Sequence, residues 1–209
     1  MTDISSVSLP DWLDVSRETY DRLLGYLALV EKWSAKINLI GRGSLHDAWN
    51  RHVLDSAQLV AISRDRPGPW VDLGSGAGFP GLVVAIMMRE TEPDRTVILV
   101  DSDQRKATFL RQAAHDFAPN AQIICDRAEA IPSLNAAILS ARALAHLSEL
   151  CNHADRHLAA DGLALFLKGA QYEGELAMAR RDWVFDVEVT PSCTDPTAAV
   201  LALRNIRHA

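Results

Sequence analysis

Glycine residues crowd the segment 71–81, which reads Val-Asp-Leu-Gly-Ser-Gly-Ala-Gly-Phe-Pro-Gly. A short apolar run precedes the glycines, and Pro80 is well placed to open a helix after them. Glycine lets the backbone turn sharply and lets a ligand approach the peptide groups with no Cβ in the way. Open amides at the start of a helix favour an anion. The segment therefore predicts a ligand-binding turn between a strand and a helix.

Two known ligand patterns fit this turn. Read from Gly76, the segment satisfies the dinucleotide pattern G-x-G-x-x-G, and Asp101 follows about 20 residues later. Read from Gly74, every second residue is a glycine, and Asp72 stands at the end of the strand. The second register follows directly from the apolar run. It resembles the first motif of class I methyltransferases that use S-adenosylmethionine (AdoMet), in which this loop holds the methionine part of the cofactor.

Asp101 is the second candidate ligand residue, because it ends the apolar run 97–100. A carboxylate there can accept both hydroxyls of an adenosyl ribose, since it presents two oxygens side by side. The alternative is a helix N-cap, a duty that Ser102 or Asp103 could share. The glycine loop one turn earlier favours the ribose interpretation.

The elements that precede the loop are predicted to be helical. Over residues 14–37 the apolar side chains recur with a helical period, at Tyr20, Leu23, Leu24, Leu27, Val30, Trp33 and Ile37. A second helix is expected from Ser44 to Ile62, and the Pro- and Gly-containing stretch 64–69 predicts a loop. We therefore expect an N-terminal helical segment, residues 1–65, packed on a core domain of residues 66–209.

From Trp70 onwards short apolar runs alternate with helical stretches. Such alternation indicates an α/β fold with a mostly parallel sheet covered on both faces. Two strand-like runs, 183–189 and 198–206, end the chain and predict an antiparallel hairpin. The strand-like runs lie at residues 70–73, 97–100, 123–125, 136–139, 163–167, 183–189 and 198–206. They predict a seven-stranded, Rossmann-like sheet preceded by the N-terminal helices.

Charge and composition make some classes of substrate, cofactor and location less expected than others. The net charge of −6 favours a small-molecule substrate over nucleic acid, although an acidic enzyme can carry a local basic face. The three cysteines are far apart, and no histidine has ligand-like spacing with a carboxylate or cysteine cluster, so no metal is expected. The first ten residues lack the features of a secretory signal, and no apolar run approaches the roughly 20 residues that span a bilayer. We expect a cytoplasmic protein that is a monomer.

With these motifs placed, the chain closely resembles one family, the bacterial small-subunit (16S) ribosomal RNA guanine-N7 methyltransferases, also called glucose-inhibited division protein B. The resemblance covers nearly the whole chain. The run Arg51-His-Val-Leu-Asp-Ser56 ahead of the glycine loop is specific to this family, whereas the loop alone is not. Further matching segments lie at 33–39, 72–81, 99–111, 127–129, 140–143 and 167–169.

The resemblance implies roles for particular residues. AdoMet would be held by the loop and by the following turns, through Gly74, Ser75, Gly76, Gly78, Phe79, Asp101, Ser102, the backbone of Ala128 and Glu129, and Arg142. The resemblance also implies that Arg142 lies near the target base. Our own hypothesis is that Arg142 and Lys168 hold the guanine O6 edge or a phosphate, and that Arg127 does likewise or pairs with Glu129. Arg51 and His52 would help to bind RNA at the rim, or Arg51 would merely pair with Asp55 four residues on.

The expected methyl transfer requires the protein mainly to align the sulfur, the methyl group and the accepting nitrogen. Guanine N7 carries a free lone pair and no proton, so no general base is required. The sequence accordingly offers no obvious nucleophile–base pair around the glycine loop. Two alternatives stay open: an AdoMet-dependent methyltransferase of a small molecule, and a non-catalytic protein that binds a nucleotide or RNA. The 51–56 run disfavours the first, and the intact loop with Asp101 disfavours the second.

Overall fold

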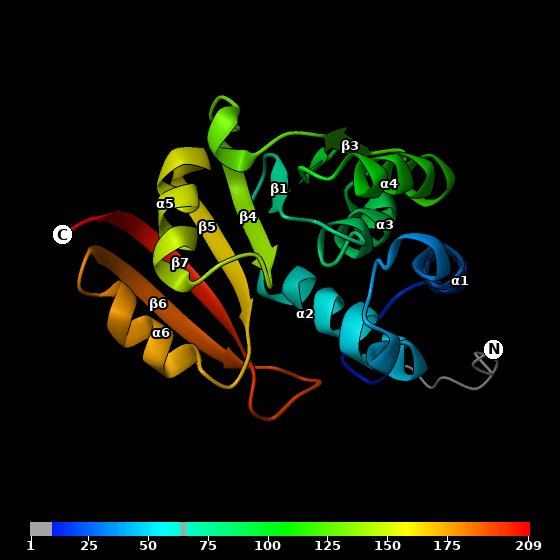
Figure 1. Cartoon of the computed structure of the whole chain (residues 1–209), viewed down its shortest axis with the longest axis horizontal. Coiled ribbons are helices and arrows are strands. Elements are labelled where there is room, and N and C mark those ends of the chain that lie inside the picture. Colours follow the sequence, from blue (N-terminus) through cyan, green and yellow to red (C-terminus); the bar gives the residue numbers. More distant parts are fainter. Residues whose placement is uncertain (1–9, 64–65) are drawn as a thin grey trace.

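The computed structural model of the chain describes residues 10–63 and 66–209. Within these residues one mixed sheet lies between two layers of helices (Figure 1). Its strands are β1 (Trp70–Leu73), β2 (Val97–Val100), β3 (Ala121–Ile124), β4 (Ala136–Arg142), β5 (Leu158–Lys168), β6 (Trp183–Pro191) and β7 (Ala199–His208). The α-helices are α1 (Arg17–Ile37), α2 (Asp55–Ile62), α3 (Gly81–Thr91), α4 (Gln104–Phe117), α5 (Leu147–His157) and α6 (Tyr172–Ala179).

The strand order is β3-β2-β1-β4-β5-β7-β6. Strands β1 to β5 run parallel, while β7 pairs antiparallel with both β5 and β6. The chain moves outward from β1 to β3 and then returns to place β4 on the other side of β1. Ligands of open α/β sheets bind where the order reverses in this way, beyond the carboxyl ends of the strands. The expected seven-stranded, mostly parallel sheet with an antiparallel hairpin is confirmed.

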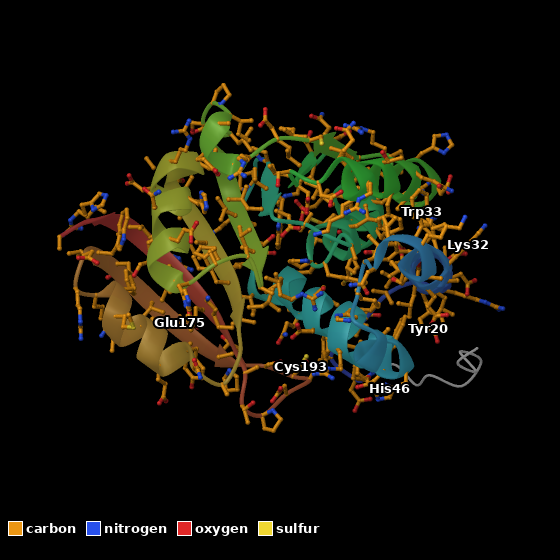
Figure 2. All side chains as sticks on the ribbon, viewed as in Figure 1. Tyr20, Lys32, Trp33, His46, Glu175 and Cys193 are labelled. Carbon is orange, nitrogen blue, oxygen red and sulfur yellow. The ribbon has the colours of Figure 1, made fainter. Side chains whose placement is uncertain are left out.

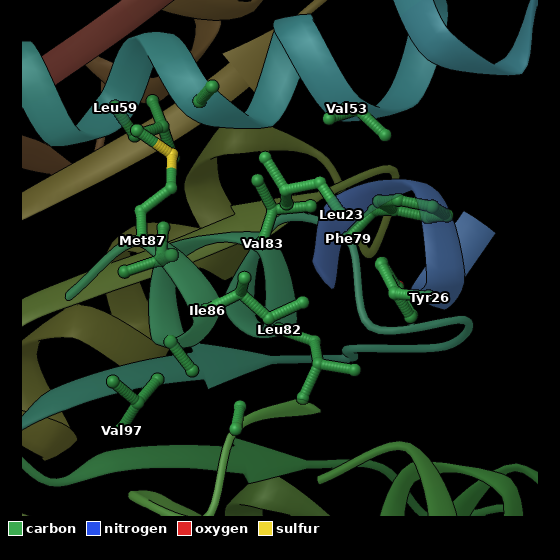
Figure 3. Packing of buried hydrophobic residues seen from close by; sticks show 14 of the residues in the cluster. Leu23, Tyr26, Val53, Leu59, Phe79, Leu82, Val83, Ile86, Met87 and Val97 are labelled. Carbon is green, nitrogen blue, oxygen red and sulfur yellow. The ribbon is translucent and has the colours of Figure 1, made fainter. Parts of the chain in front are cut away.

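Each face of the sheet has its own apolar core. Helices α1 to α4 cover one face, and α5 and α6 cover the other (Figure 1). On the first face α3 is buried along most of its length, because Val83 and Met87 pack beneath Val53 and Leu59 (Figure 3). Helices α1 and α2 thus pack mainly on α3 and α4, which lie between them and the sheet.

The first helix follows its sequence signals closely. Ser16 caps its start by accepting a hydrogen bond from the backbone N–H of Thr19. Asn38 ends it in the left-handed conformation, with φ at 51°. The buried positions, Leu23, Tyr26, Leu27 and Val30, recur with the helical period.

The second helix is less regular than the expected continuous helix from Ser44. A 3-10 turn, η2 (Arg42–Asp47), leads into a π-helical segment, η3 (Trp49–Leu54), and only then into α2. The backbone N–H of Asp55 accordingly bonds to the carbonyl of Asn50, five residues back. π-Helical turns occur often at functional sites, and this one carries Arg51 and His52.

Part of the sequence-based expectation lies outside the described residues. The absence of a secretory signal concerned residues 1–10, of which 1–9 are not described, and the boundary loop 64–69 includes 64 and 65. Among the helices that are described, none combines the length and apolar character needed to cross a bilayer. The same residues contain no cluster of His, Cys, Asp or Glu side chains arranged to hold a metal ion.

Candidate cofactor and substrate site

The glycine loop leaves β1 through three left-handed residues. Gly74, Gly76 and Gly78 have φ angles of 66°, 57° and 91°, a region that side chains other than glycine rarely adopt. A Cβ built at Gly76 would meet only the carbonyl oxygen of Gly74, 3.8 Å away. The backbone at Gly76 therefore faces open space, where a ligand can approach it.

The other two glycines are needed for packing. A Cβ at Gly78 would lie 2.8 Å from the hydroxyl of Tyr26 and 2.9 Å from Leu82 Cβ. A Cβ at Gly74 would lie 2.6 Å from Leu144, which the loop after β4 places over it. The repeated glycines thus serve two purposes, which the sequence pattern alone does not separate.

Buried polar groups fix the shape of the loop. Asp72 accepts hydrogen bonds from the Ser140 hydroxyl (2.7 Å) and from the backbone N–H of Gly81 (3.1 Å). Burial raises the pKa of Asp72 to about 6, although the hydrogen bond from Ser140 opposes that rise. From α1, the Tyr26 hydroxyl donates to the carbonyl of Ala77. Asp72 and Tyr26 therefore support the loop from inside the fold.

Asp101 connects the end of β2 to the glycine loop. Its carboxylate accepts the backbone N–H of Gly76 and that of Asp103, each at 2.8 Å. The N-cap of α4 is Asp103, whose side chain accepts the backbone N–H groups of Arg105 and Lys106. Asp101 is thus not the cap of that helix, and its carboxylate retains lone pairs for a further donor.

The segment expected to meet adenine is held from α5. His157, which is fully buried, donates from Nε2 to the carbonyl of Ala128 at 2.9 Å. Burial lowers the pKa of His157, which favours the neutral ring in that tautomer. Beside it, Arg127 and Glu129 are both exposed and lie 3.4 Å apart. The structure therefore shows Arg127 in the simple surface pair that was its alternative role.

A cavity of about 870 Å³ opens beyond the carboxyl ends of β4 and β5. Its walls come from the loop after β4, from η3 and α2, and from the loop between β6 and β7, which reaches beneath α2 (Figure 1). Arg51, Arg142 and Lys168 all line it, whereas Arg127 does not. Leu144 lines the cavity and also covers Gly74, so the cavity adjoins the glycine loop.

Arg142 is the best-anchored cation in this cavity. Its Nη1 donates to the carbonyl of Arg51 and to Nδ1 of His52, each at 3.0 Å, and lies 3.5 Å from a carboxylate oxygen of Asp55. Burial, together with the charge of Arg142, lowers the pKa of His52 to about 4, so the ring is a neutral acceptor at physiological pH. The guanidinium lies 5.2 Å from the ring centre of Phe79, which also stacks on His52.

Lys168 is a fixed cation rather than a mobile one. Its Nζ lies 2.6 Å from a carboxylate oxygen of Glu175 and donates to the carbonyl of Ala145 at 2.8 Å. Glu175 approaches from α6, where that helix lies against α5 (Figure 2). One of the three ammonium protons remains for a substrate.

Asp55 pairs with a cation that its spacing did not indicate. The four-residue spacing allowed an ion pair with Arg51 as one of two interpretations, but the π turn intervenes and Asp55 lies against Arg142 instead. Its other oxygen accepts the hydroxyls of Ser192 and Thr194, at 3.3 and 3.2 Å. Figure 2 labels their neighbour Cys193 near the start of this loop, where its thiol lies against the carbonyl of Leu54. No local sequence signal predicts contacts across more than 130 positions.

The solved structures that resemble this chain show its fold. A SAM-dependent methyltransferase from Aquifex aeolicus superposes with a TM-score of 0.59 at 10% identity, covering 85% of this chain and 97% of that one. The glycopeptide N-methyltransferase MtfA, solved with AdoMet, gives a TM-score of 0.58 at 11% identity, with 73% of this chain and 93% of that one covered. Identities this low support the fold alone.

Comparison with curated sequences identifies the family as well as the fold. The GidB family model, described as rRNA small subunit methyltransferase G, matches residues 19–200. Ribosomal RNA small subunit methyltransferase G of Cereibacter sphaeroides is 50% identical over 196 residues, which is 94% of this chain and 95% of the relative. The protein of that name from Paracoccus denitrificans is 46% identical, covering 94% and 100%. The chain therefore belongs to the rRNA small subunit methyltransferase G (GidB) family of AdoMet-dependent methyltransferases.

Proposed function

We propose that this protein transfers the methyl group of AdoMet to N7 of a guanine in 16S ribosomal RNA. One observation supports this most: a cavity large enough for a nucleobase adjoins the glycine loop and is lined by Arg51, Arg142 and Lys168. Ligand pockets of this kind measure about 300–1,000 Å³. The relatives' printed name supplies the substrate class, and the resemblance of the sequence supplies the base and the atom.

The glycine loop fits AdoMet as its ligand. The left-handed backbone at Gly76 faces open space, and the Asp101 carboxylate sits beside it with lone pairs to spare. The apolar ring of Phe79 and the neutral ring of His52 stack next to the loop. The residues proposed to hold the cofactor are Gly74, Ser75, Gly76, Gly78, Phe79, Asp101, Ser102, Ala128, Glu129 and Arg142.

The residues of the cavity would act by positioning the base. Bound AdoMet would supply a sulfonium methyl group to the N7 lone pair, with the neutral thioether as the leaving group, so the positive charge would pass to the guanine and no proton would have to move. Arg142 and Lys168 are proposed to donate to the O6 edge, which fixes N7 in line. Alignment of this kind can contribute roughly 7–11 kcal/mol in favourable systems. Arg127 lies outside the cavity wall, so its proposed role is the weakest of the three.

The charge of the cavity favours a base over a phosphate. Three cations line it, but so do five carboxylates, those of Asp47, Asp55, Glu149, Glu175 and Asp195. An excess of negative charge repels a phosphate, whereas it favours the cation that a guanine becomes when N7 is methylated. Phosphate binding would then belong to exposed residues at the rim such as Arg51. The net charge of −6, which by itself argues against RNA, is compatible with this arrangement.

The remaining proposals concern the protein as a whole. We propose a cytoplasmic monomer that acts on the 16S RNA or on the small ribosomal subunit. We also propose that residues 1–65 form a helical segment on the core domain of residues 66–209. The contacts of α1 and α2 with α3 support such an arrangement.

The experiment is transfer of labelled methyl from AdoMet to small subunits and to naked 16S RNA, both from cells that lack this protein. Digestion to nucleosides should place the label in 7-methylguanosine at one site. A label in another nucleoside would overturn the assignment of N7. No label in RNA, in a sample that binds AdoMet by calorimetry, would instead favour a small-molecule substrate.

A further inference from the structure

Arg142 places a positive charge next to the site proposed for a cationic cofactor. In the register of the sheet Ala141 of β4 lies opposite Leu73 of β1, so Arg142 is level with Gly74. Its guanidinium lies over Phe79 of the same loop. The sulfonium of AdoMet also carries a positive charge, so the loop and the cavity beside it must accommodate two cations.

Solvent screens this charge only in part. The side chains of Arg142 and Asp55 are 19% and 16% exposed. At an effective dielectric constant near 20, an uncompensated charge several ångströms from a cation would weaken its binding about tenfold or more. A nearby carboxylate removes most of that penalty.

Asp55 is held in place independently of Arg142. One of its oxygens accepts hydrogen bonds from Ser192, Thr194 and Gln58. Its other oxygen lies 3.5 Å from Nη1 of Arg142. The carboxylate is thus fixed by two elements, α2 and the loop between β6 and β7, and does not depend on the guanidinium for its position.

We infer that Asp55 is a positioning residue that neutralises Arg142, so that this guanidinium can serve beside a cationic cofactor. The inference rests on the glycine loop as the cofactor site, but it does not depend on RNA as the substrate. Asp55 itself touches neither the cofactor nor the reacting atoms. The effect of Asp55 on cofactor binding is electrostatic. It can therefore be distinguished from a change in the shape of the site.

The test compares two ligands that differ in charge at sulfur. AdoMet carries the sulfonium, and S-adenosylhomocysteine has a neutral thioether at the same position. In Asp55→Asn the amide oxygen can still accept the hydroxyls of Ser192 and Thr194, while the negative charge is lost. Calorimetry should show AdoMet binding about tenfold more weakly in this variant, with S-adenosylhomocysteine changed less than about threefold.

Removing the charge of Arg142 should change the relative affinity for AdoMet and S-adenosylhomocysteine in the opposite direction. Arg142→Gln leaves Asp55 negative and unpaired, so the ratio of the two dissociation constants should shift in favour of AdoMet. The double variant Asp55→Asn/Arg142→Gln should return the ratio to near the wild-type value. These comparisons use the ratio alone, so a direct contact between Arg142 and both ligands would not disturb them.

The binding measurements can overturn the inference in two ways. If Asp55→Asn weakens both ligands equally, or neither, Asp55 has no electrostatic role toward the cofactor and the inference is wrong. If that variant shows no cooperative thermal transition, Arg142→Gln carries the test, and an unchanged ratio there overturns the inference. If the wild-type protein binds neither ligand, the assignment of the glycine loop fails instead, which is a different result.

Discussion

At the scale of single residues, the site depends on carboxylates that the fold partly or fully buries. Asp72 lies inside the fold and ties β1 to β4 and to the start of α3. Asp101 ties β2 to the glycine loop, and Asp55 ties α2 to the loop between β6 and β7. All three accept several hydrogen bonds, which offset the cost of removing a charge from water. Their shared effect is to hold backbone segments around a ligand site.

Asp72 predicts a specific pH dependence of stability. Its folded-state pKa of about 6 lies above the ordinary value of 3.8, so the folded protein binds this proton more tightly than the unfolded chain. The stabilisation by that proton is complete only well below pH 3.8 and is lost as the pH rises through about 6, a total change of about 3 kcal/mol. The free energy of unfolding in urea, measured as wild type minus Asp72→Asn, should fall by about 2–2.5 kcal/mol between pH 4 and pH 7. The exposed Asp161→Asn is the control, and a difference that does not change with pH would refute the prediction.

Alanine at Gly78 should mainly reduce stability, whereas alanine at Gly76 should mainly weaken AdoMet binding. Gly78→Ala should lower the free energy of unfolding by about 2–3 kcal/mol, because the methyl group would contact Tyr26 and Leu82 in a strained backbone. Gly76→Ala should cost only about 1 kcal/mol, because its methyl group meets open space. Its AdoMet dissociation constant should nevertheless rise, as calorimetry would show. Normal AdoMet binding by Gly76→Ala would contradict the assignment of this loop surface.

At the scale of elements, two segments far apart in the sequence close the cavity. The π-helical η3 with α2 forms one wall, and the loop between β6 and β7 forms another. Asp55 and Gln58 join them, since the backbone N–H of Cys193 donates to the Gln58 side chain at 3.2 Å. The antiparallel hairpin therefore contributes to the cavity proposed as the substrate site as well as to the sheet.

That connection can be tested without altering Asp55. Ser192→Ala/Thr194→Ala removes two hydroxyl donors and should lower kcat/KM for RNA by about tenfold, because the wall loses two of its hydrogen bonds to α2. The dissociation constant for AdoMet should change less than about twofold. Thr190→Ala, at the end of the preceding strand, is the matched control. An unchanged kcat/KM in the double variant would show that the loop position does not matter for substrate.

Sequence reasoning predicted those parts of the fold that local patterns encode. Periodicity gave α1, alternation gave the sheet, and the two terminal runs gave the hairpin, because each depends on neighbouring residues. The π turn at η3 was not predicted, since one extra residue per turn leaves no mark on an apolar pattern. For that reason the spacing did not indicate Arg142 as the partner of Asp55, and the contacts of Asp55 with Ser192 and Thr194 depend on tertiary packing. The roles of Gly76 and Gly78 became distinct only once their neighbours were known.

At the scale of the whole molecule, negative charge and RNA binding are compatible because charge is distributed unevenly. The cavity itself holds more carboxylates than cations. Its partly buried Arg142 and its buried Lys168 are paired with Asp55 and Glu175. Arg51 differs, because it is exposed and lines the opening. An acidic protein can thus present a cation to a phosphate at the rim while keeping the interior suited to a base that becomes positively charged.

Arg51 therefore predicts the salt dependence of RNA binding. Arg51→Ala should weaken RNA binding and reduce the slope of log affinity against log salt by about one, as expected for the loss of one phosphate contact. AdoMet binding should be unaffected. Arg207→Ala changes the same charge near the end of β7, away from Ala199, which lines the cavity at the start of that strand, and should leave the slope unaltered. Equal slopes for Arg51→Ala and the wild type would place RNA binding elsewhere.

The proposed function is tested most directly by labelled methyl transfer to small subunits, with wild type and Arg142→Ala compared at equal AdoMet saturation. We expect the wild type to place the label in 7-methylguanosine at one site. Arg142→Ala, which loses the cation anchored between the glycine loop and the cavity, should transfer the label at least about a hundredfold more slowly. Equal rates for the two proteins would contradict this proposal, because the cavity beside the glycine loop would then not be where the base is held.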